Sequence, residues 1–247
     1  MKVSIITIVY NNRETIADAI ESVLGQTHPD IEYIVVDGRS TDGTVEVVKS
    51  YGGRISTFVS EKDNGLYDAI NKGIKLATGD VIGLLHSDDL FYAPDAIAQV
   101  VATFARSGAE SVYGDLLYVR KENTEKIVRN WVSGEYNRAN FLYGWMPPHP
   151  TFYVKREVYN NLGLYNTQFK SAADYELMLR YLYKYKISTA YIPAKLVKMR
   201  VGGKSNVTLR NRIRANKEDY QAWLTNGLQP PFYTRFLKPL RKLTQFI

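Results

Sequence analysis

Residues 3–9 read Val-Ser-Ile-Ile-Thr-Ile-Val, and this β-branched apolar run is typical of a strand buried on both faces. Apolar residues recur at helical spacing over 16–24, and Gly25 supplies a stop for the expected helix. The alternation continues, with further strands expected at 31–36, 55–59 and 81–85 and further helices at 41–51, 67–77 and 94–106. This order predicts an α/β fold with a mainly parallel central sheet flanked by helices.

The second half of the chain is less regular, and no repeat, low-complexity tract or linker separates it from the first. Strands are expected at 111–113, 116–120, 126–131 and 189–192, and helices at 137–143, 156–162 and 174–185. We therefore expect one domain over residues 1–225, followed by a basic amphipathic tail over 226–247.

The composition excludes several classes of protein. A hydrophobic content of 45% is ordinary for a globular chain, and the absence of cysteine excludes disulfides and zinc–thiolate sites. The N-terminus enters an apolar strand without a signal-peptide pattern, and no apolar run approaches the roughly 20 residues of a membrane span. We therefore expect a cytoplasmic protein, either soluble or peripheral at the inner face of the cell membrane.

The net charge of +7 and the pI of about 9.3 indicate an anionic partner, which could be nucleic acid, nucleotide or anionic lipid. The 19 tyrosines are scattered rather than set in an RNA-recognition pattern. We therefore expect no nucleic acid among the partners.

Polar clusters stand at the ends of three expected strands, at residues 10–12, 37–40 and 86–89. In open parallel sheets, ligands bind outside the carboxyl ends of the strands. Neither the Gly-x-Gly-x-x-Gly pattern of dinucleotide-binding folds nor the P-loop pattern is present. The three clusters together predict a polar pocket of another kind.

Asp88 and Asp89 are adjacent carboxylates directly after an apolar strand, where they are costly unless solvated, hydrogen-bonded or bound to a cation. Mg²⁺ and Mn²⁺ prefer one or two carboxylates together with phosphate oxygens, which is the arrangement that neutralises a diphosphate leaving group. The alternative is that both residues merely cap the following helix. Asp37 at a neighbouring strand end favours the ligand-binding interpretation.

The sequence around these clusters resembles family 2 of the inverting glycosyltransferases, which have the GT-A fold. The matching blocks, in the family's order, are residues 3–11, 19–27, 32–44, 63–73, 77–80 and 87–89. The likeness is dense over 1–115, which it implies to be the nucleotide-sugar-binding half. It is sparser over the acceptor-binding half, 116–225.

The resemblance implies a role for each cluster. The base of the nucleotide would be held by Thr7, the backbone at Val9, Tyr10 and Asn11, and Asp37. The base and phosphates would have Asp68, Asn71 and Lys72 beside them. Ser87 and Asp88 would contact the donor, Asp88 at its ribose, and Asp89 would bind a divalent cation, Mn²⁺ or Mg²⁺, and the diphosphate. The family's triplet usually begins with aspartate, so Ser87 leaves the metal to Asp89 alone.

Asp174 matches the family's catalytic base, at the start of an expected helix. Such a base removes the proton of the acceptor hydroxyl as its oxygen attacks the anomeric carbon, and a helix N-terminus favours the ionised carboxylate. The alternative is an ordinary acid of a first helical turn, and Glu176 is the second choice as base. His149, in a proline-rich loop, could bind donor phosphate or acceptor, or could simply orient that loop.

The function implied is transfer of a hexosyl or N-acetylhexosaminyl unit from a nucleotide-diphospho-sugar to a glycan or lipid-linked glycan acceptor, in bacterial cell-surface polysaccharide synthesis. One alternative is sugar-phosphate nucleotidyl transfer, but such enzymes carry a Gly-rich basic loop after the first strand, where this chain has residues 10–13, Tyr-Asn-Asn-Arg. Another alternative is a non-catalytic nucleotide-sugar-binding relative, which need not keep Asp89 and Asp174 together.

In the tail, a helical projection of residues 232–247 places apolar side chains on one side and arginine and lysine on the other. This pattern is typical of a helix lying on an anionic membrane surface. A terminal helix that packs on its own domain is the equal alternative, and Pro239 would kink either one.

Overall fold

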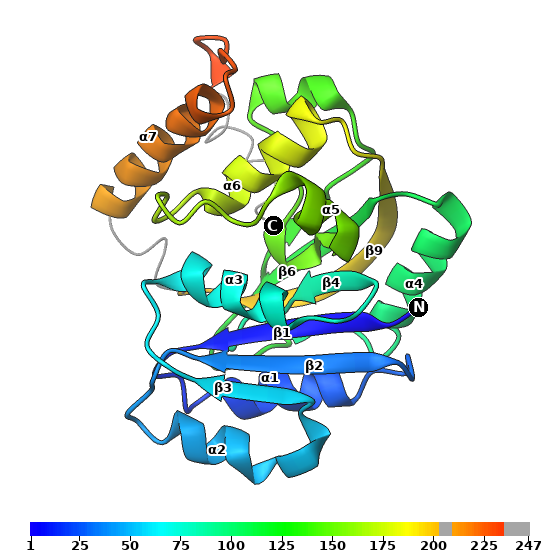
Figure 1. The fold of residues 1–247 in the computed structure, drawn as a ribbon, viewed down its shortest axis with the longest axis vertical. Helices are drawn as coiled ribbons and strands as arrows, with labels where there is room; N and C mark the ends of the chain where they lie inside the picture. The colour runs from blue at the N-terminus through cyan, green and yellow to red at the C-terminus, as the bar shows by residue number, and fades with distance from the viewer. Residues whose placement is uncertain (203–208, 235–247) are drawn as a thin grey trace.

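The computed structural model describes residues 1–202 and 209–234, and a nine-stranded sheet runs through it with helices on both faces (Figure 1). The strand order is β3-β2-β1-β4-β8-β6-β9-β5, with β7 paired to β6. The strands are β1 (Val3–Val9), β2 (Ile31–Asp37), β3 (Thr57–Ser60), β4 (Val81–Leu84), β5 (Asp89–Phe91), β6 (Ser111–Val119), β7 (Ile127–Trp131), β8 (Tyr153–Lys155) and β9 (Thr189–Arg200).

The first four strands pair in parallel, as predicted, and all seven residues of β1 are buried. In the second half, β8 is antiparallel to both β4 and β6, while the long strand β9 is parallel to β6 and antiparallel to β5. The α/β class is therefore confirmed, and antiparallel pairs are concentrated in the second half of the chain.

The helices cover the two faces of the sheet and build two separate cores. The α-helices are α1 (Ile16–Leu24), α2 (Thr44–Ser50), α3 (Leu66–Leu76), α4 (Ala96–Ser107), α5 (Arg156–Leu162), α6 (Ala173–Met178) and α7 (Leu209–Thr225). On one face, α1 and α4 bury Ile20 and Val100 against the sheet. On the other face, α3, α5 and α6 bury Ile70, Val158 and Leu177 in the second core, which burial of apolar surface stabilises.

Helix α6 continues without a break into a π-helical turn, Leu179–Lys184, and α7 lies along it on the outside of the molecule (Figure 1). Figure 1 also shows α3 on the same side of the sheet as α5 and α6. The predicted helix over 174–185 thus exists, with a π-helical second half.

The predicted tail falls largely outside the described residues, because 235–247 are not among them. The last described residues of the tail contact the domain. The hydroxyl of Thr234 donates to the carbonyl of Leu142 (2.5 Å), and the ring of Tyr233 stacks on that of Tyr143 with 5.8 Å between the centroids.

Candidate functional site

The three polar clusters predicted from the sequence meet at the carboxyl ends of β1, β2 and β4. The register pairs Val9 with Asp37, and the Gly38 amide donates to the carbonyl of Val9 (2.9 Å). The side-chain amide of Asn12 donates to the hydroxyl of Ser87 (2.9 Å). The main chains of the parallel strands therefore bring these segments together, as the sequence predicted.

The loops of the first two clusters hold each other in place. The Asn11 amide donates to the Ser40 hydroxyl (2.8 Å), and the Asn11 side chain accepts from the amide of Thr41 (2.8 Å). Asn11 and Arg39 have positive φ angles of 48° and 67°, an uncommon conformation for residues other than glycine. Tyr10, between these contacts and the end of β1, is 54% exposed at the rim.

Two predicted base-binding residues have partners inside the protein. Thr7 is fully buried, and its hydroxyl accepts a hydrogen bond from the Tyr33 hydroxyl (3.0 Å). Asp37 is also fully buried, and it accepts from the hydroxyl and amide of Ser40 (2.5 and 3.0 Å) and from the hydroxyl of Ser60 (2.6 Å). The carboxylate of Asp37 thereby fixes the loop at the end of β2.

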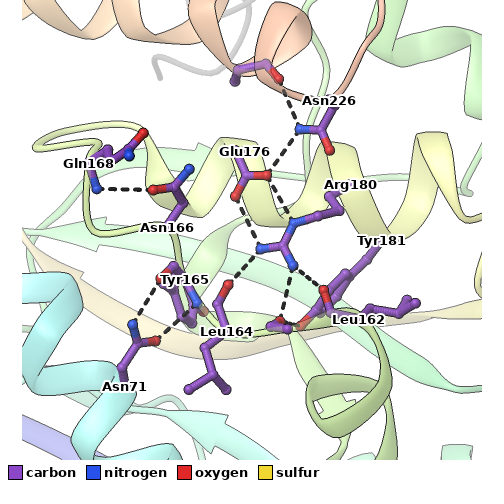
Figure 2. A network of polar contacts seen from close by, with 12 residues as sticks. Asn71, Leu162, Leu164, Tyr165, Asn166, Gln168, Glu176, Arg180, Tyr181 and Asn226 are labelled. Atoms are coloured by element: carbon purple, nitrogen blue, oxygen red, sulfur yellow. Dashed lines mark hydrogen bonds and ion pairs between the residues drawn. The ribbon is translucent and has the colours of Figure 1, made fainter.

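The three predicted residues on α3 do not share one environment. Asp68 accepts from the Asn64 amide (2.9 Å), and Lys72 pairs with Glu61 (2.8 Å) and lies 3.8 Å from Asp68. These two therefore line the turn that precedes α3. Asn71 points toward the second half (Figure 2). Its side-chain nitrogen Nδ2 donates to the backbone carbonyl of Tyr165 (2.8 Å), and its side-chain oxygen Oδ1 accepts from the backbone N–H of Tyr165 (3.0 Å).

Asp89 is the first residue of β5 and is only 1% exposed. Its Oδ1 accepts from the Arg200 amide (3.3 Å), whereas its buried Oδ2 has no hydrogen-bond partner in the described part of the chain. Burial, and then the charge of Asp88, raises the pKa of Asp89 well above its usual range. A buried carboxylate oxygen without a donor fits a bound cation.

The protein supplies few ligands for such a cation, because the described residues contain no group of three or more histidine, aspartate or glutamate side chains placed to hold a metal. Mg²⁺ and Mn²⁺ accept this arrangement when phosphate oxygens complete the coordination shell. The donor set therefore fits a cation that arrives with a diphosphate, as the single ligand Asp89 implied.

Arg200, at the end of β9, was not predicted as a site residue. Its guanidinium is 6% exposed, donates to the Asp88 carbonyl (3.0 Å) and pairs with Asp18 of α1 (2.5 Å). It therefore links the main chain of the Asp88-Asp89 turn to α1. The sequence offered no signal for this contact, because the expected strand ended at 192.

Asp174 lies half-buried at the start of α6, and its Oδ1 accepts from the Tyr67 hydroxyl of α3 (3.3 Å). Tyr67 stacks on Tyr165 with 5.8 Å between ring centroids. Burial, and then the charge of Asp174, raises the pKa of Tyr67, so its hydroxyl remains a neutral donor. The carboxylate of Asp174 is thus held by a residue from the first half of the chain.

Two histidines, one from each half of the chain, lie beside each other. The His149 ring nitrogen Nε2 is 2.7 Å from the Tyr165 hydroxyl, and its ring centroid is 5.8 Å from that of His86. Burial lowers the pKa of His86, and the charges of Asp88 and Asp174 oppose that lowering. Burial, and then His86, lowers the pKa of His149 to about 3, so this imidazole is neutral at physiological pH.

Glu176, the second choice as base, faces away from this group. Its side chain is 3% exposed, and it pairs with Arg180 (2.9 Å) and accepts from the Asn226 side-chain amide of the segment after α7 (3.0 Å) (Figure 2). The geometry therefore favours Asp174, which is half-buried and contacts Tyr67 of α3, over Glu176, whose carboxylate is already held by Arg180 and Asn226.

Arg180 joins α6, which carries Asp174, to the loop that carries Tyr165. Besides Glu176, its guanidinium binds the carbonyls of Leu162, Gly163 (3.1 Å) and Leu164 (2.6 Å) (Figure 2). Because Asn71 of α3 holds the backbone of Tyr165, one polar network connects α3, this loop and α6.

The model of glycosyl transferase family 2 matches residues 4–170, more than half of the chain. The chain belongs to this family. A related protein, an uncharacterized glycosyltransferase of Mycobacterium tuberculosis, is 33% identical over 180 residues, which are 72% of this chain and 68% of that protein. A PGL/p-HBAD biosynthesis glycosyltransferase of Mycobacterium bovis is 28% identical over 193 residues, 76% of this chain and 73% of that protein.

Solved structures share the fold of this family 2 glycosyltransferase. A 1–349 fragment of S. aureus TarS, solved with UDP-GlcNAc, gives a TM-score of 0.71 at 18% identity and covers 92% of this chain and 65% of that one. The mannosyltransferase PcManGT from Pyrobaculum calidifontis, solved with GDP-Man and Mn²⁺, gives a TM-score of 0.67 at 21% identity and covers 96% of this chain and 68% of that one. The predicted family and the GT-A fold are both confirmed.

Among the described residues, no helix has the length and apolar character to cross a bilayer.

Proposed function

We propose that this family 2 glycosyltransferase moves a hexosyl or N-acetylhexosaminyl unit from a nucleotide-diphospho-sugar to a hydroxyl of a glycan or lipid-linked glycan acceptor, with inversion at the anomeric carbon. The observation that carries the proposal is contact between the two halves of the chain: the Tyr67 hydroxyl donates to Asp174 (3.3 Å), and the ring of His86, beside the Ser87-Asp88-Asp89 turn, lies 5.8 Å from that of His149. The two relatives are mycobacterial, and one is named a PGL/p-HBAD biosynthesis glycosyltransferase, which supports a role in bacterial cell-surface glycan synthesis.

The first half would hold the donor. The loops at the ends of β1 and β2, with Asp37 as their anchor, would enclose the base, and Asp68 and Lys72 would lie at its edge. Asp88 would contact the ribose and Asp89 the cation. When bound, Mn²⁺ or Mg²⁺ would neutralise the diphosphate that departs.

The second half would supply the acceptor site and the base. The carboxylate of Asp174 would take the proton of the acceptor hydroxyl while that oxygen attacks the anomeric carbon on the face opposite the diphosphate. Tyr67 would orient this carboxylate through Oδ1, which leaves Oδ2 for the proton. His86 and His149, as neutral imidazoles, would donate or accept hydrogen bonds to sugar hydroxyls between the two carboxylates.

A thermal-shift panel of UDP, GDP, dTDP and CMP, with and without Mn²⁺, tests this function. We expect one nucleotide at about 100 times its Kd to add about 2.7 kcal/mol to the free energy of unfolding, which raises Tm by about 5–10 °C. Asp89→Asn should remove the part of this shift that depends on Mn²⁺, because the amide has no negative charge and only one oxygen to offer the cation.

Asp30→Asn is the matched control for the panel. Asp30 is exposed and lies directly before the amino end of β2, whereas the polar clusters follow the carboxyl ends of the strands. Its variant should therefore show the full nucleotide shift. A panel in which no nucleotide raises the Tm of the wild-type chain would contradict the proposed function.

We also propose that residues 232–247 bind an anionic membrane surface, where a lipid-linked acceptor would be found. Phe232 is 81% exposed beside the stacked pair of Tyr143 and Tyr233, and aromatic side chains are favoured at such interfaces.

Flotation with vesicles that contain anionic lipid should recover the full chain at least threefold better than a chain ending at Gln229. Replacing Arg235, Lys238, Arg241 and Lys242 by Gln should remove most of that difference. Equal flotation of the full and shortened chains would rule the membrane contact out.

A further inference from the structure

One carboxylate oxygen of α7 accepts three successive backbone N–H groups directly before α6. Oε2 of Glu218 lies 3.1 Å from the amide nitrogen of Lys170, 2.7 Å from that of Ser171 and 3.0 Å from that of Ala172. The segment 170–172 ends one residue before α6 begins and two residues before Asp174. The backbone on which Asp174 depends is therefore fastened by a different helix.

This contact fastens the N-cap residue of α6 and the two residues before it. The N-cap residue of α6 is Ala172, which has no side-chain acceptor, and the helix shows no side-chain cap hydrogen bond. Free N–H groups at a helix start need an acceptor, and an ionised carboxylate there gains from the helix dipole and from charge-assisted hydrogen bonds. Glu218 supplies such an acceptor for Ala172, Ser171 and Lys170, and it places a carboxylate beside the N-terminus of α6.

Two other contacts from the same part of the chain hold the residues that follow Asp174. The indole N–H of Trp223 donates to the hydroxyl of Tyr175 (2.9 Å), and the side-chain amide of Asn226 donates to Glu176 (3.0 Å). Tyr175 and Glu176 are both buried. The α7 region therefore fixes the chain on both sides of Asp174, and Glu218 is the contact on the N-terminal side.

We propose that Glu218 is a positioning residue for the base Asp174: by fixing the backbone at 170–172, it sets the direction in which the Asp174 carboxylate points into the site. This inference rests on the proposed function, in which Asp174 takes the acceptor proton. Small displacements of a catalytic group have large effects on rate, because proton transfer requires hydrogen-bond distance.

The test compares Glu218→Gln with Lys217→Gln in the full chain. Lys217 is exposed on the neighbouring position of the same helix, so Lys217→Gln controls for introducing a glutamine into α7, although it changes the net charge by one unit in the opposite direction. In Glu218→Gln we expect kcat for transfer to fall about tenfold, while the Kd of the donor nucleotide stays within twofold of the wild-type value. Lys217→Gln should change neither quantity by more than twofold.

Hydrogen–deuterium exchange gives a readout that does not need catalysis. The amides of residues 170–172 should exchange about tenfold faster in Glu218→Gln, because a neutral amide oxygen holds three donors less well than a carboxylate. Glu218→Asp keeps the charge and should recover part of the lost kcat.

A folded Glu218→Gln chain with kcat within twofold of wild type would overturn the proposal. A parallel fall in kcat and in nucleotide affinity would also overturn it, because it would show that Glu218 supports the fold as a whole. These results differ from a failure of the proposed function, in which the wild-type chain itself would transfer no sugar although the amides of 170–172 would still be protected.

Discussion

Asp174→Asn is expected to lower kcat for sugar transfer by about 10³-fold while leaving the Kd of the donor nucleotide within twofold of the wild-type value. General-base catalysis contributes about 10²–10⁴ to a rate, and an amide cannot take up the acceptor proton. The substitution keeps the shape of the side chain and its Oδ1, so the hydrogen bond from Tyr67 survives. The proposed nucleotide contacts lie in the other half of the chain, and binding should therefore persist.

Glu176→Gln serves as the comparison for this variant, because Glu176 is the other acidic residue in the first turn of α6. Its carboxylate is buried against Arg180 and Asn226, so we expect it to affect stability more than chemistry. Transfer is measured with the donor identified by the nucleotide panel. If Asp174→Asn kept more than a tenth of the wild-type kcat, Asp174 would not be the base.

The order of elements in the first half could be predicted because each one carries its own periodic pattern. The run from Val3 to Val9 and the helix after it are both present in the structure. The short strands β5 and β8 were missed, because three residues are too few to show a period and both strands are defined by partners distant in sequence, β9 and β4. The strand predicted at 189–192 continues to Arg200 for the same reason.

The candidate site shows the same division. The clusters at the strand ends were predicted to meet, and the parallel register explains why they do. By contrast, Tyr67 and Arg200 reach Asp174 and Asp88 through contacts between residues more than a hundred positions apart. Such contacts depend on how the second half folds back on the sheet, which local patterns do not specify. Asn71 is similar, since only the structure shows that its amide is used by the backbone of Tyr165.

The Arg180 guanidinium is expected to be one of the largest single contributors to stability in this chain. Arg180→Met should lower the free energy of unfolding by about 3–5 kcal/mol, which is the usual cost of removing one partner from a buried ion pair. Glu176 would remain with 3% of its side chain exposed and would keep the neutral donor Asn226, while the carbonyls of Leu162, Gly163 and Leu164 would lose a shared donor.

Urea unfolding followed by circular dichroism measures this loss as a change in the midpoint at constant slope. Arg138→Met is the matched control: its guanidinium also donates to a backbone carbonyl, that of Tyr183, and lies over the Tyr183 ring, but it is exposed. We expect less than about 1 kcal/mol from that variant, because exposed charged contacts are screened by water. A loss below about 1 kcal/mol in Arg180→Met would show that α6 and the 162–165 loop stay together through apolar packing. The polar network would then be dispensable for the position of Asp174.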